Sequence, residues 1–370
     1  MNIEMIIRTL LKRVNKISEV KGYNKYIKSY SMSKMFLMML YQQLSGNNYG
    51  RSFILQAKKV IGKEGSIPSQ SELSKKLSYK IPVDLFKRIY TEAIRLTLSH
   101  GGKRKKKMLN SLRIIDSSHL SASLSMKWAK HRSTKNGLKI HLMINSDLVP
   151  EAFRLKNGRS SDKKSLRWAI KRGFIYVFDR GYNDYKLFSD IQGQEAFFVT
   201  RMLGNAVCEI ESRRRVGKRQ QEKGIVSDEI VSVIKDRKTL ETIQFRRIIF
   251  RFIDAKGEEK QFSLLTNLKD ISSDEITKIY RERWNIEVVF RWIKMFLSID
   301  HWMSRSVNGV MIQLYSALIM YLIVKLAHAV AKTKKRILKD YCHEYLELFL
   351  KIFRSDGKTN FLLGFVYNES

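Results

Sequence analysis

The first hundred residues carry apolar side chains at the three- and four-residue spacing of amphipathic helices. This spacing holds in "MNIEMIIRTLLKRVNK" from residue 1, in "MSKMFLMMLYQQL" and in "IPVDLFKRIYTEAIRLTL". Pro68 and Pro82 mark turns, and Ser71 stands at the N-cap position of a short helix between them. We predict a helical N-terminal domain over residues 1–108. Its segment 66–81 fits a helix-turn-helix that reads DNA and a small helical bundle equally well.

Beyond a basic linker at 100–109, the pattern changes to short apolar and alternating runs typical of strands. "SLRIIDSS", "LKIHLMINS" and "PEAFRLKNG" predict three strands, and "SDKKSLRWAIKR" predicts a helix capped by Ser161. The strand "GFIYVFDRGY", the helix "NDYKLFSDIQ" and the strand "EAFFVTRM" follow. This is the element order of a ribonuclease-H-like fold, an α/β fold with a mixed five-stranded sheet.

Residues 203–262 interrupt this order and predict an inserted β-rich subdomain. "ESRRRVGKRQQEKG" predicts a basic loop, and three β-like runs begin at residues 225, 242 and 260. A helix over 279–294 follows the insertion. The apolar run at 310–324 contains Gln313 and is shorter than the ~20 residues of a membrane span, so we interpret it as a buried helix. The catalytic domain would cover 109–330, and a helical tail 331–370.

The helix at 279–294 combines an apolar face with an unusual polar strip. At about 100° per residue, Tyr280, Arg283, Glu287 and Lys294 fall within an arc of roughly 60° beside the apolar residues. A solvated helix edge with an Arg–Glu pair at i,i+4 is the plain alternative. The remaining carboxylates of the chain decide between these interpretations.

Two aspartates stand at the C-terminal ends of predicted strands, Asp116 after "RII" and Asp179 after "YVF". Each alone is typical of a turn or a helix cap. Substrates and metal ions, however, gather at the carboxyl ends of strands in open α/β sheets. Carboxylate oxygens suit Mg²⁺ or Mn²⁺, and two ions about 3.5–4 Å apart support phosphodiester attack. Glu287 can supply the third carboxylate that such a site needs.

The charge of the chain indicates a polyanionic partner. Lys and Arg number 70 against 35 Asp and Glu, which gives a net charge of +35. Such an excess is typical of nucleic-acid binding. The two cysteines, Cys208 and Cys342, lie far apart in sequence, which argues against a zinc site or a disulfide scaffold and fits a reducing compartment.

With these residues in view, the chain resembles the DDE (Asp-Asp-Glu) transposases of bacterial insertion sequences, specifically insertion-sequence family four. The matching text is "IIDSS", "VFDRGY", "LLTNL" and the Tyr-x2-Arg-x3-Glu-x6-Lys signature at 280–294, within residues 110–330. The resemblance implies that Asp116, Asp179 and Glu287 form a triad that binds Mg²⁺ or Mn²⁺, with two ions. It also implies that phosphates of the transposon end are held by Tyr280, Arg283 and Lys294. A tryptophan often stacks on an opened base in this family, and the candidates are Trp284, Trp292 and Trp302.

The expected function is that of a transposase. It would cleave double-stranded DNA at the inverted-repeat ends of its element and transfer the 3′-OH ends to target DNA, as a homodimer assembled on DNA. The helical N-terminal domain over residues 1–108 would bind the DNA ends. We expect a soluble protein of the bacterial cytoplasm, associated with the nucleoid and not with a membrane. Two alternatives stay open: a metal-dependent nuclease of similar fold without strand transfer, and a catalytically inactive DNA-binding protein derived from a transposase.

Overall fold

A computed structural model describes residues 3–25, 31–44, 50–61, 67–100, 107–129, 136–160, 166–236, 238–253, 257–296 and 302–331. Most of the linker expected at 100–109, the predicted helix start at Ser161 and nearly all of the expected tail at 331–370 lie outside these residues. The chain forms two compact units. One comprises residues 1–103, 120–137 and 290–370, and the other comprises 104–119 and 138–289.

Helices dominate the first unit and strands the second. The helices and helical turns are α1 (Ile3–Val20), α2 (Met32–Leu44), α3 (Gly50–Ile61), α4 (Gln70–Lys75), η1 (Lys76–Lys80), α5 (Val83–His100), α6 (Lys107–Asn110), η2 (Arg167–Ala169), η3 (Arg180–Tyr182), α8 (Tyr185–Gly193), α9 (Lys218–Gln221), α10 (Ser273–Arg281), α11 (Trp284–Phe296) and α12 (Val307–Ala331). The strands are β1 (Leu112–Ala122), β2 (Asn136–Asn145), β3 (Pro150–Asn157), β4 (Ile175–Phe178), β5 (Phe197–Arg201), β6 (Glu209–Arg213), β7 (Ile225–Asp236), β8 (Glu241–Ile253) and β9 (Glu259–Thr266).

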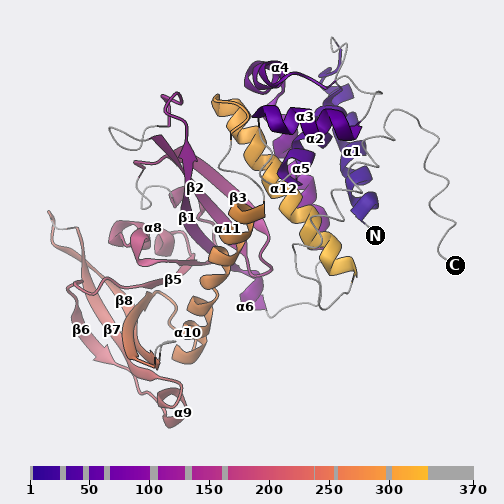
Figure 1. Cartoon of the computed structure of the whole chain (residues 1–370). Helices are drawn as coiled ribbons and strands as arrows, with labels where there is room; N and C mark the ends of the chain where they lie inside the picture. The colour runs from indigo at the N-terminus through magenta and orange to yellow at the C-terminus, as the bar shows by residue number, and fades with distance from the viewer. Residues whose placement is uncertain are drawn as a thin grey trace, which may run out of the picture. The chain divides into compact units, whose positions relative to one another are not determined.

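The described strands form a single mixed sheet in the order β3-β2-β1-β4-β5-β9-β8-β7-β6 (Figure 1). Strands β1, β4 and β5 are parallel, whereas β5 and β9 are antiparallel. The mixed α/β class is therefore confirmed, but the sheet has nine described strands where the sequence predicted five. The reason is that β9 pairs with β5 from Val199↔Thr266 to Arg201↔Leu264, so the strands of the insertion continue the sheet. This pairing satisfies the backbone groups that β5 would otherwise leave unpaired at an edge.

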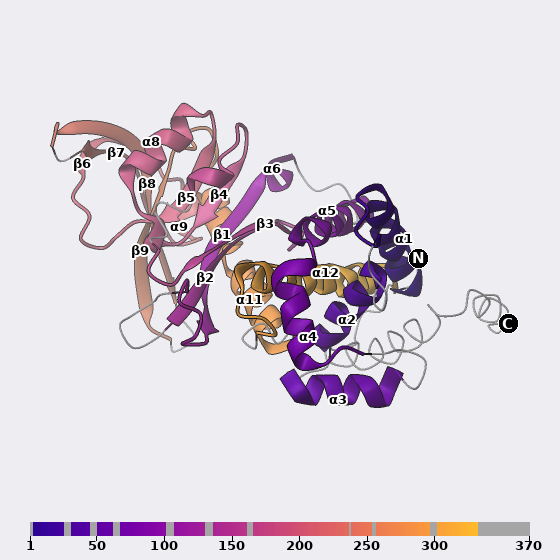
Figure 2. The same cartoon turned by 90° about the horizontal axis from the view of Figure 1, so that it is seen from above.

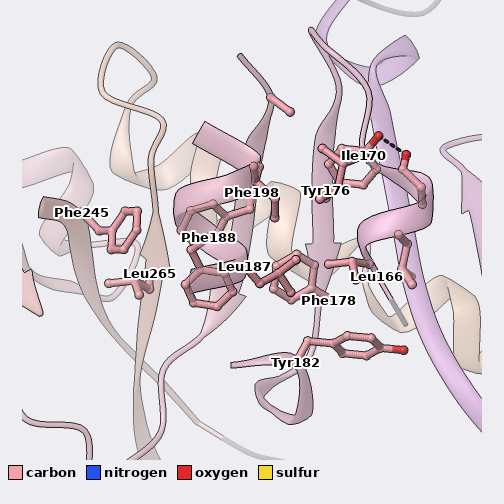
Figure 3. Packing of buried hydrophobic residues seen from close by; sticks show 14 of the residues in the cluster. Leu166, Ile170, Tyr176, Phe178, Tyr182, Leu187, Phe188, Phe198, Phe245 and Leu265 are labelled. Carbon is pink, nitrogen blue, oxygen red and sulfur yellow. Dashed lines mark hydrogen bonds between the residues drawn. The ribbon is translucent and has the colours of Figure 1, made fainter. Parts of the chain in front are cut away.

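One face of this sheet is covered by α8 through a cluster of aromatic side chains (Figure 3). The Phe188 ring of α8 stacks on Phe198 of β5 with 4.5 Å between centroids, and Phe198 meets Phe245 of β8 edge-on. Asp184 caps α8 by accepting from the backbone N–H groups of Lys186 and Leu187. Burial of several rings fixes this helix against the sheet, since each large apolar side chain contributes about 1.5–3 kcal/mol when fully buried.

The opposite face of the same strands carries α10. Phe262 and Leu265 of β9 are three residues apart and therefore point to opposite faces. Leu265 belongs to the cluster under α8, whereas the ring of Phe262 packs on Tyr280 of α10 with 5.9 Å between centroids. The strands thus lie between α8 and the helix that begins the signature segment.

The helical unit is built around α12, which packs against α1, α2 and α5 (Figure 2). Its segment Val307–Ala327 is long and apolar enough to cross a membrane, but 89% of the most apolar window is buried inside the fold. The interpretation of the 310–324 run as a buried helix is confirmed, although the helix is longer than the run. Gln313 is buried and its side-chain oxygen accepts the backbone N–H of Met303.

Three local predictions are wrong. Ser69, not Ser71, caps α4, because the Ser69 hydroxyl accepts the backbone N–H of Glu72 at 3.2 Å. The basic stretch expected as a loop holds the end of β6 and the short helix α9.

The third concerns the helix expected at 161–172. Its described part forms only the 3₁₀ turn η2, and an extended backbone follows at Ile170. The buried Tyr176 hydroxyl donates to the carbonyl of Ala169 at 2.6 Å and accepts the N–H of Lys171 at 2.8 Å. These bonds occupy backbone groups that a further helical turn would use.

Candidate active site

The signature segment is not one helix, contrary to the prediction for 279–294. Helix α10 ends at Arg281 and α11 begins at Trp284, so Tyr280 and Glu287 lie on different helices. The turn between them is held by i,i+3 bonds from the N–H of Arg283 to the carbonyl of Tyr280 and from the N–H of Ile286 to that of Arg283. The helical arc calculated above therefore applies only to Glu287 and Lys294, both on α11.

Arg283 in this turn connects two of the three predicted carboxylates. Its Nη2 lies 2.7 Å from Oε1 of Glu287, and its Nη1 lies 3.7 Å from Oδ2 of Asp116. The Arg283 side chain is only 16% exposed, and its charge acts on the nearby Tyr280 hydroxyl as well. A largely shielded cation between two carboxylates is held by stronger electrostatics than a fully exposed pair.

The two aspartates lie side by side because their strands are parallel. Ile114 of β1 is in register with Val177 of β4, and Asp116 and Asp179 stand two residues further along each strand. Strand β4 stops at Phe178, whereas β1 continues to Ala122, so the prediction that Asp116 ends its strand is wrong. Asp116 instead stands where the neighbouring strand has ended, which leaves its side chain beside the open end of β4.

Asp179 is oriented by the turn that follows it. Its Oδ1 accepts the backbone N–H of Gly181 at 2.8 Å, which caps η3. A Cβ at residue 181 would lie 3.0 Å from the same oxygen, so glycine allows the Asp179 carboxylate to lie this close to the backbone. The Thr200 hydroxyl donates to the Asp179 carbonyl at 3.2 Å and ties the turn to β5.

The carboxyl of Asp116 has a pKa raised to about 6. Burial is the largest cause, and the charges of Asp179 and Glu287 raise the pKa further. The Ser117 backbone N–H, which donates to Oδ1 at 2.7 Å, and the Arg283 guanidinium act in the opposite direction. The three predicted carboxylates are thus within electrostatic reach of one another, in one compact unit of the chain.

This pKa predicts a pH-dependent cost to stability. The folded state holds the Asp116 proton up to about pH 6 and the unfolded state only to about 3.8, so stability falls as pH rises through that window. Above about pH 6 the ionised Asp116 destabilises the fold by its full amount, at most about 3 kcal/mol, since one pKa unit corresponds to about 1.36 kcal/mol. We expect Asp116→Asn to raise the melting temperature at neutral pH, measured calorimetrically in EDTA, and to raise it much less near pH 4.

The matched control for this measurement is Asp270→Asn, which alters an exposed carboxylate in the same unit. Its melting temperature should follow the wild type at both pH values. An equal stabilisation by Asp116→Asn at neutral and acidic pH would show that the carboxylate charge is not the cause.

The three carboxylates are suitable ligands for a hard divalent cation, but their side chains are not arranged around a common point. Within the described part of the chain, no three His, Cys, Asp or Glu side chains converge closely enough to hold a metal ion together. Asp116 and Glu287 instead share the guanidinium of Arg283. Carboxylate oxygens that repel one another are nevertheless the ligand type that Mg²⁺ and Mn²⁺ prefer, and such a cation would relieve the repulsion that raises the Asp116 pKa.

Sequence reasoning missed Arg201, which lies beside the signature residues. Its guanidinium packs over the ring of Phe262 at 5.1 Å, next to Tyr280. Burial raises the pKa of the Tyr280 hydroxyl, and the charges of Arg283 and Arg201 oppose this effect. A signal was available, because Arg201 ends β5 and Asp179 follows β4, and the carboxyl ends of parallel strands meet at one edge.

The other candidates differ in their surroundings. Lys294 lies in the last turn of α11, and the part of this helix from Phe290 onward belongs to the other compact unit. The position of Lys294 beside the triad therefore stays a prediction. Trp292 is 9% exposed and meets Tyr321 edge-on, and the Trp302 indole donates to the carbonyl of Ser121. Trp284 is 58% exposed and follows Arg283 directly. Of the three, Trp284 offers the most accessible ring.

A buried ion pair from the insertion holds the start of α10. Arg246 of β8 and Asp228 of β7 are 2% and 4% exposed, and their side chains form two bonds of 2.8 and 2.6 Å. The same guanidinium donates to the carbonyls of Leu268, Lys269 and Ile271, directly before α10. Insertion strands thereby position the helix that carries Tyr280.

Two further side chains of the insertion contact α10 itself. The Gln220 amide donates to the hydroxyl of Ser273 at 2.9 Å, and Lys223 pairs with Asp274 at 2.6 Å. Together with Arg246 they secure the first turn of α10, at the end of the helix opposite Tyr280.

Comparison with known proteins identifies the family of the chain. The family model described as "Transposase DDE domain" matches residues 107–323. The chain is 30% identical over 232 residues to a Sinorhizobium fredii protein named as the transposase y4zB, covering 62% of this chain and 64% of that protein. It is 24% identical over 319 residues, 84% of this chain and 80% of the relative, to a Geobacillus stearothermophilus protein named as a transposase for insertion sequence element IS5377.

The matched region contains all three carboxylates, the signature segment and the insertion. The chain belongs to the DDE transposase family of insertion sequence elements, and the resemblance drawn from the sequence is confirmed.

Proposed function

We propose that this protein cleaves double-stranded DNA at the inverted-repeat ends of an insertion sequence and transfers the freed 3′-OH ends to target DNA. The observation that carries the proposal is the gathering of Asp116, Asp179 and Glu287. The register of β1 with β4 brings the two aspartates side by side, and Arg283 contacts both Asp116 and Glu287. Membership of the DDE family supports it. The strand order β3-β2-β1-β4-β5 supports a ribonuclease-H-like core within the larger sheet.

In this proposal the three carboxylates hold divalent cations, Mg²⁺ or Mn²⁺, and two ions in number. When bound, such ions make water and a 3′-OH stronger nucleophiles and stabilise the leaving oxygen of a phosphodiester. Asp116 must be ionised to contribute as a ligand. Arg283 keeps the charges of Asp116 and Glu287 balanced in the absence of a cation, which suits a site that loads reversibly.

Tyr280, Arg283 and Lys294 of the signature would bind DNA phosphates beside the cleaved bond. Tyr280 and Arg283 stand next to the carboxylates and present a hydroxyl and a guanidinium, both good phosphate donors. Lys294 would extend this contact along α11. Arg201, with its guanidinium held over Phe262, is a further candidate for the same strand.

The net charge of +35 supports duplex DNA as the partner for both the element ends and the target. Joining two ends to one target requires that both ends be held at once. We therefore propose that two copies of the chain assemble on DNA.

A strand-transfer assay tests the function and separates it from a nuclease. The substrate is a duplex that ends in the inverted repeat found at the borders of the element, supplied with a supercoiled target plasmid and Mg²⁺. We expect plasmid covalently joined to the 3′ end of the duplex. Cleavage without joined product would favour the nuclease, and binding without cleavage would favour the inactive DNA-binding protein.

A further inference from the structure

A polar groove lies in the helical unit, formed by residues far apart in the sequence. One side is the α4–η1 segment and the other is the segment that precedes α12, and the groove measures about 630 Å³. All of its lining residues belong to one compact unit. They are Gln70, Ser71, Ser74, Lys75, Ser78, Tyr79, Trp302, Met303, Arg305 and Ser306.

The chemistry of this lining is cationic and rich in hydroxyl groups. Lys75 and Arg305 are exposed cations, and neither forms an ion pair with any residue that the structure describes. The lining itself contains no acidic side chain. Ser71 and Ser74 add hydroxyl groups on the same helical face, and Tyr79 is 87% exposed.

The two sides of the groove are fastened to each other. The Asn308 amide donates to the carbonyls of Leu77 and Ile81 at 2.7 and 2.9 Å, and the hydroxyl groups of Ser78 and Ser304 are 2.9 Å apart. Gly309 permits this packing, since a Cβ there would lie 2.3 Å from Cβ of Ser304.

The segment that carries Arg305 is anchored as well. The Trp302 indole donates to the carbonyl of Ser121 at 2.6 Å, and the Trp128 indole donates to the carbonyl of Arg305 at 2.8 Å. These bonds hold the 302–305 segment at both ends, through the side chain of Trp302 and through the backbone carbonyl of Arg305. The groove is thus preorganised, so that binding orders few additional side chains.

We propose that this groove binds the sugar-phosphate backbone of duplex DNA. Arg, Lys, Ser and Tyr side chains are the usual donors to phosphate oxygens, and such contacts position a protein on DNA independently of base sequence. An acidic protein surface would also meet the two cations, but the serine hydroxyl groups suit phosphate oxygens. The inference rests on the proposed function for its ligand and assigns a separate contact surface to it.

The experiment compares two double variants that remove equal charge. Lys75→Ala/Arg305→Ala alters the groove, whereas Lys16→Ala/Lys87→Ala removes two exposed cations of the same unit outside it. Affinity for a duplex of mixed sequence is measured by fluorescence anisotropy in EDTA, between about 50 and 200 mM salt. Equal melting temperatures establish that each variant is folded.

Each phosphate contact contributes about −0.9 to the slope of log K against log salt, so the groove variant should lose close to two units of slope. The control should keep the wild-type slope. An unchanged slope in the groove variant, or an equal loss in both variants, overturns the inference. A change in the oligomeric state of the groove variant with an unchanged slope would identify a self-contact instead and would overturn it too.

These outcomes are distinct from failure of the proposed function. If the wild type bound this duplex with no salt dependence and formed no joined product, the proposed function itself would fail. If the wild type bound steeply and joined DNA while the groove variant kept its slope, only the groove assignment would fail.

Discussion

Replacement of Asp116, Asp179 or Glu287 by its amide is expected to reduce strand cleavage about a thousandfold or more. Divalent cations contribute several kcal/mol to phosphodiester chemistry, and about 1.4 kcal/mol corresponds to a tenfold change in rate. The measurement is single-turnover cleavage of the end duplex in Mg²⁺. DNA affinity should be kept or slightly increased, because removal of a carboxylate charge does not weaken contacts to phosphate.

The controls for this experiment are Asp270→Asn and Glu222→Gln, which neutralise exposed carboxylates of the same unit. Both should cleave at the wild-type rate. A triad variant that also cleaved at the wild-type rate would remove that residue from the site. Loss of DNA binding together with cleavage would instead indicate damage to the fold.

The largest expected loss of stability comes from Arg246→Met. This change leaves Asp228, which is 4% exposed, without its cation and three carbonyl groups before α10 without their donor. Breaking a buried pair from one side typically costs about 3–5 kcal/mol. We expect a loss of that size in the free energy of unfolding, measured with urea, and slower cleavage because the segment that carries Tyr280 loses its support.

Two further variants test the cause. Arg251→Met breaks an exposed pair with Glu259 and should cost at most about 1 kcal/mol. The double variant Arg246→Met/Asp228→Leu removes both buried charges and should recover much of the loss. A cost of Arg246→Met as small as that of Arg251→Met would contradict the role assigned to the buried pair.

The mixed α/β class was predictable because the spacing of apolar residues in the strands and helices of residues 109–330 is regular. Strands β7, β8 and β9 of the insertion were also recognised, whereas β6 was not. The spacing of apolar residues does not show which strands pair with each other. The pairing of β9 with β5 depends on contacts between residues more than sixty positions apart. The sheet was therefore expected to be smaller than it is.

The residues of the candidate site could be predicted from the sequence, but their arrangement in space could be predicted only in part. Strand ends located Asp116 and Asp179, and the signature spacing located Glu287. The break between α10 and α11 was not visible, because "YRERWN" has no proline or glycine and keeps an acceptable helical pattern. Arg201 and Arg246 were missed for a related reason, since their partners come from other strands and from a distant loop.

The most direct test of the central claim is whether the carboxylates contact the catalytic cation. Asp179→Cys replaces an oxygen ligand by sulfur, which binds Mg²⁺ poorly and softer ions better. We predict almost no cleavage by this variant in Mg²⁺ and partial recovery in Mn²⁺, with Asp179→Ala inactive in both. Equal inactivity of the cysteine and alanine variants in Mn²⁺, with both folded and bound to DNA, would contradict the assignment of Asp179 as a metal ligand.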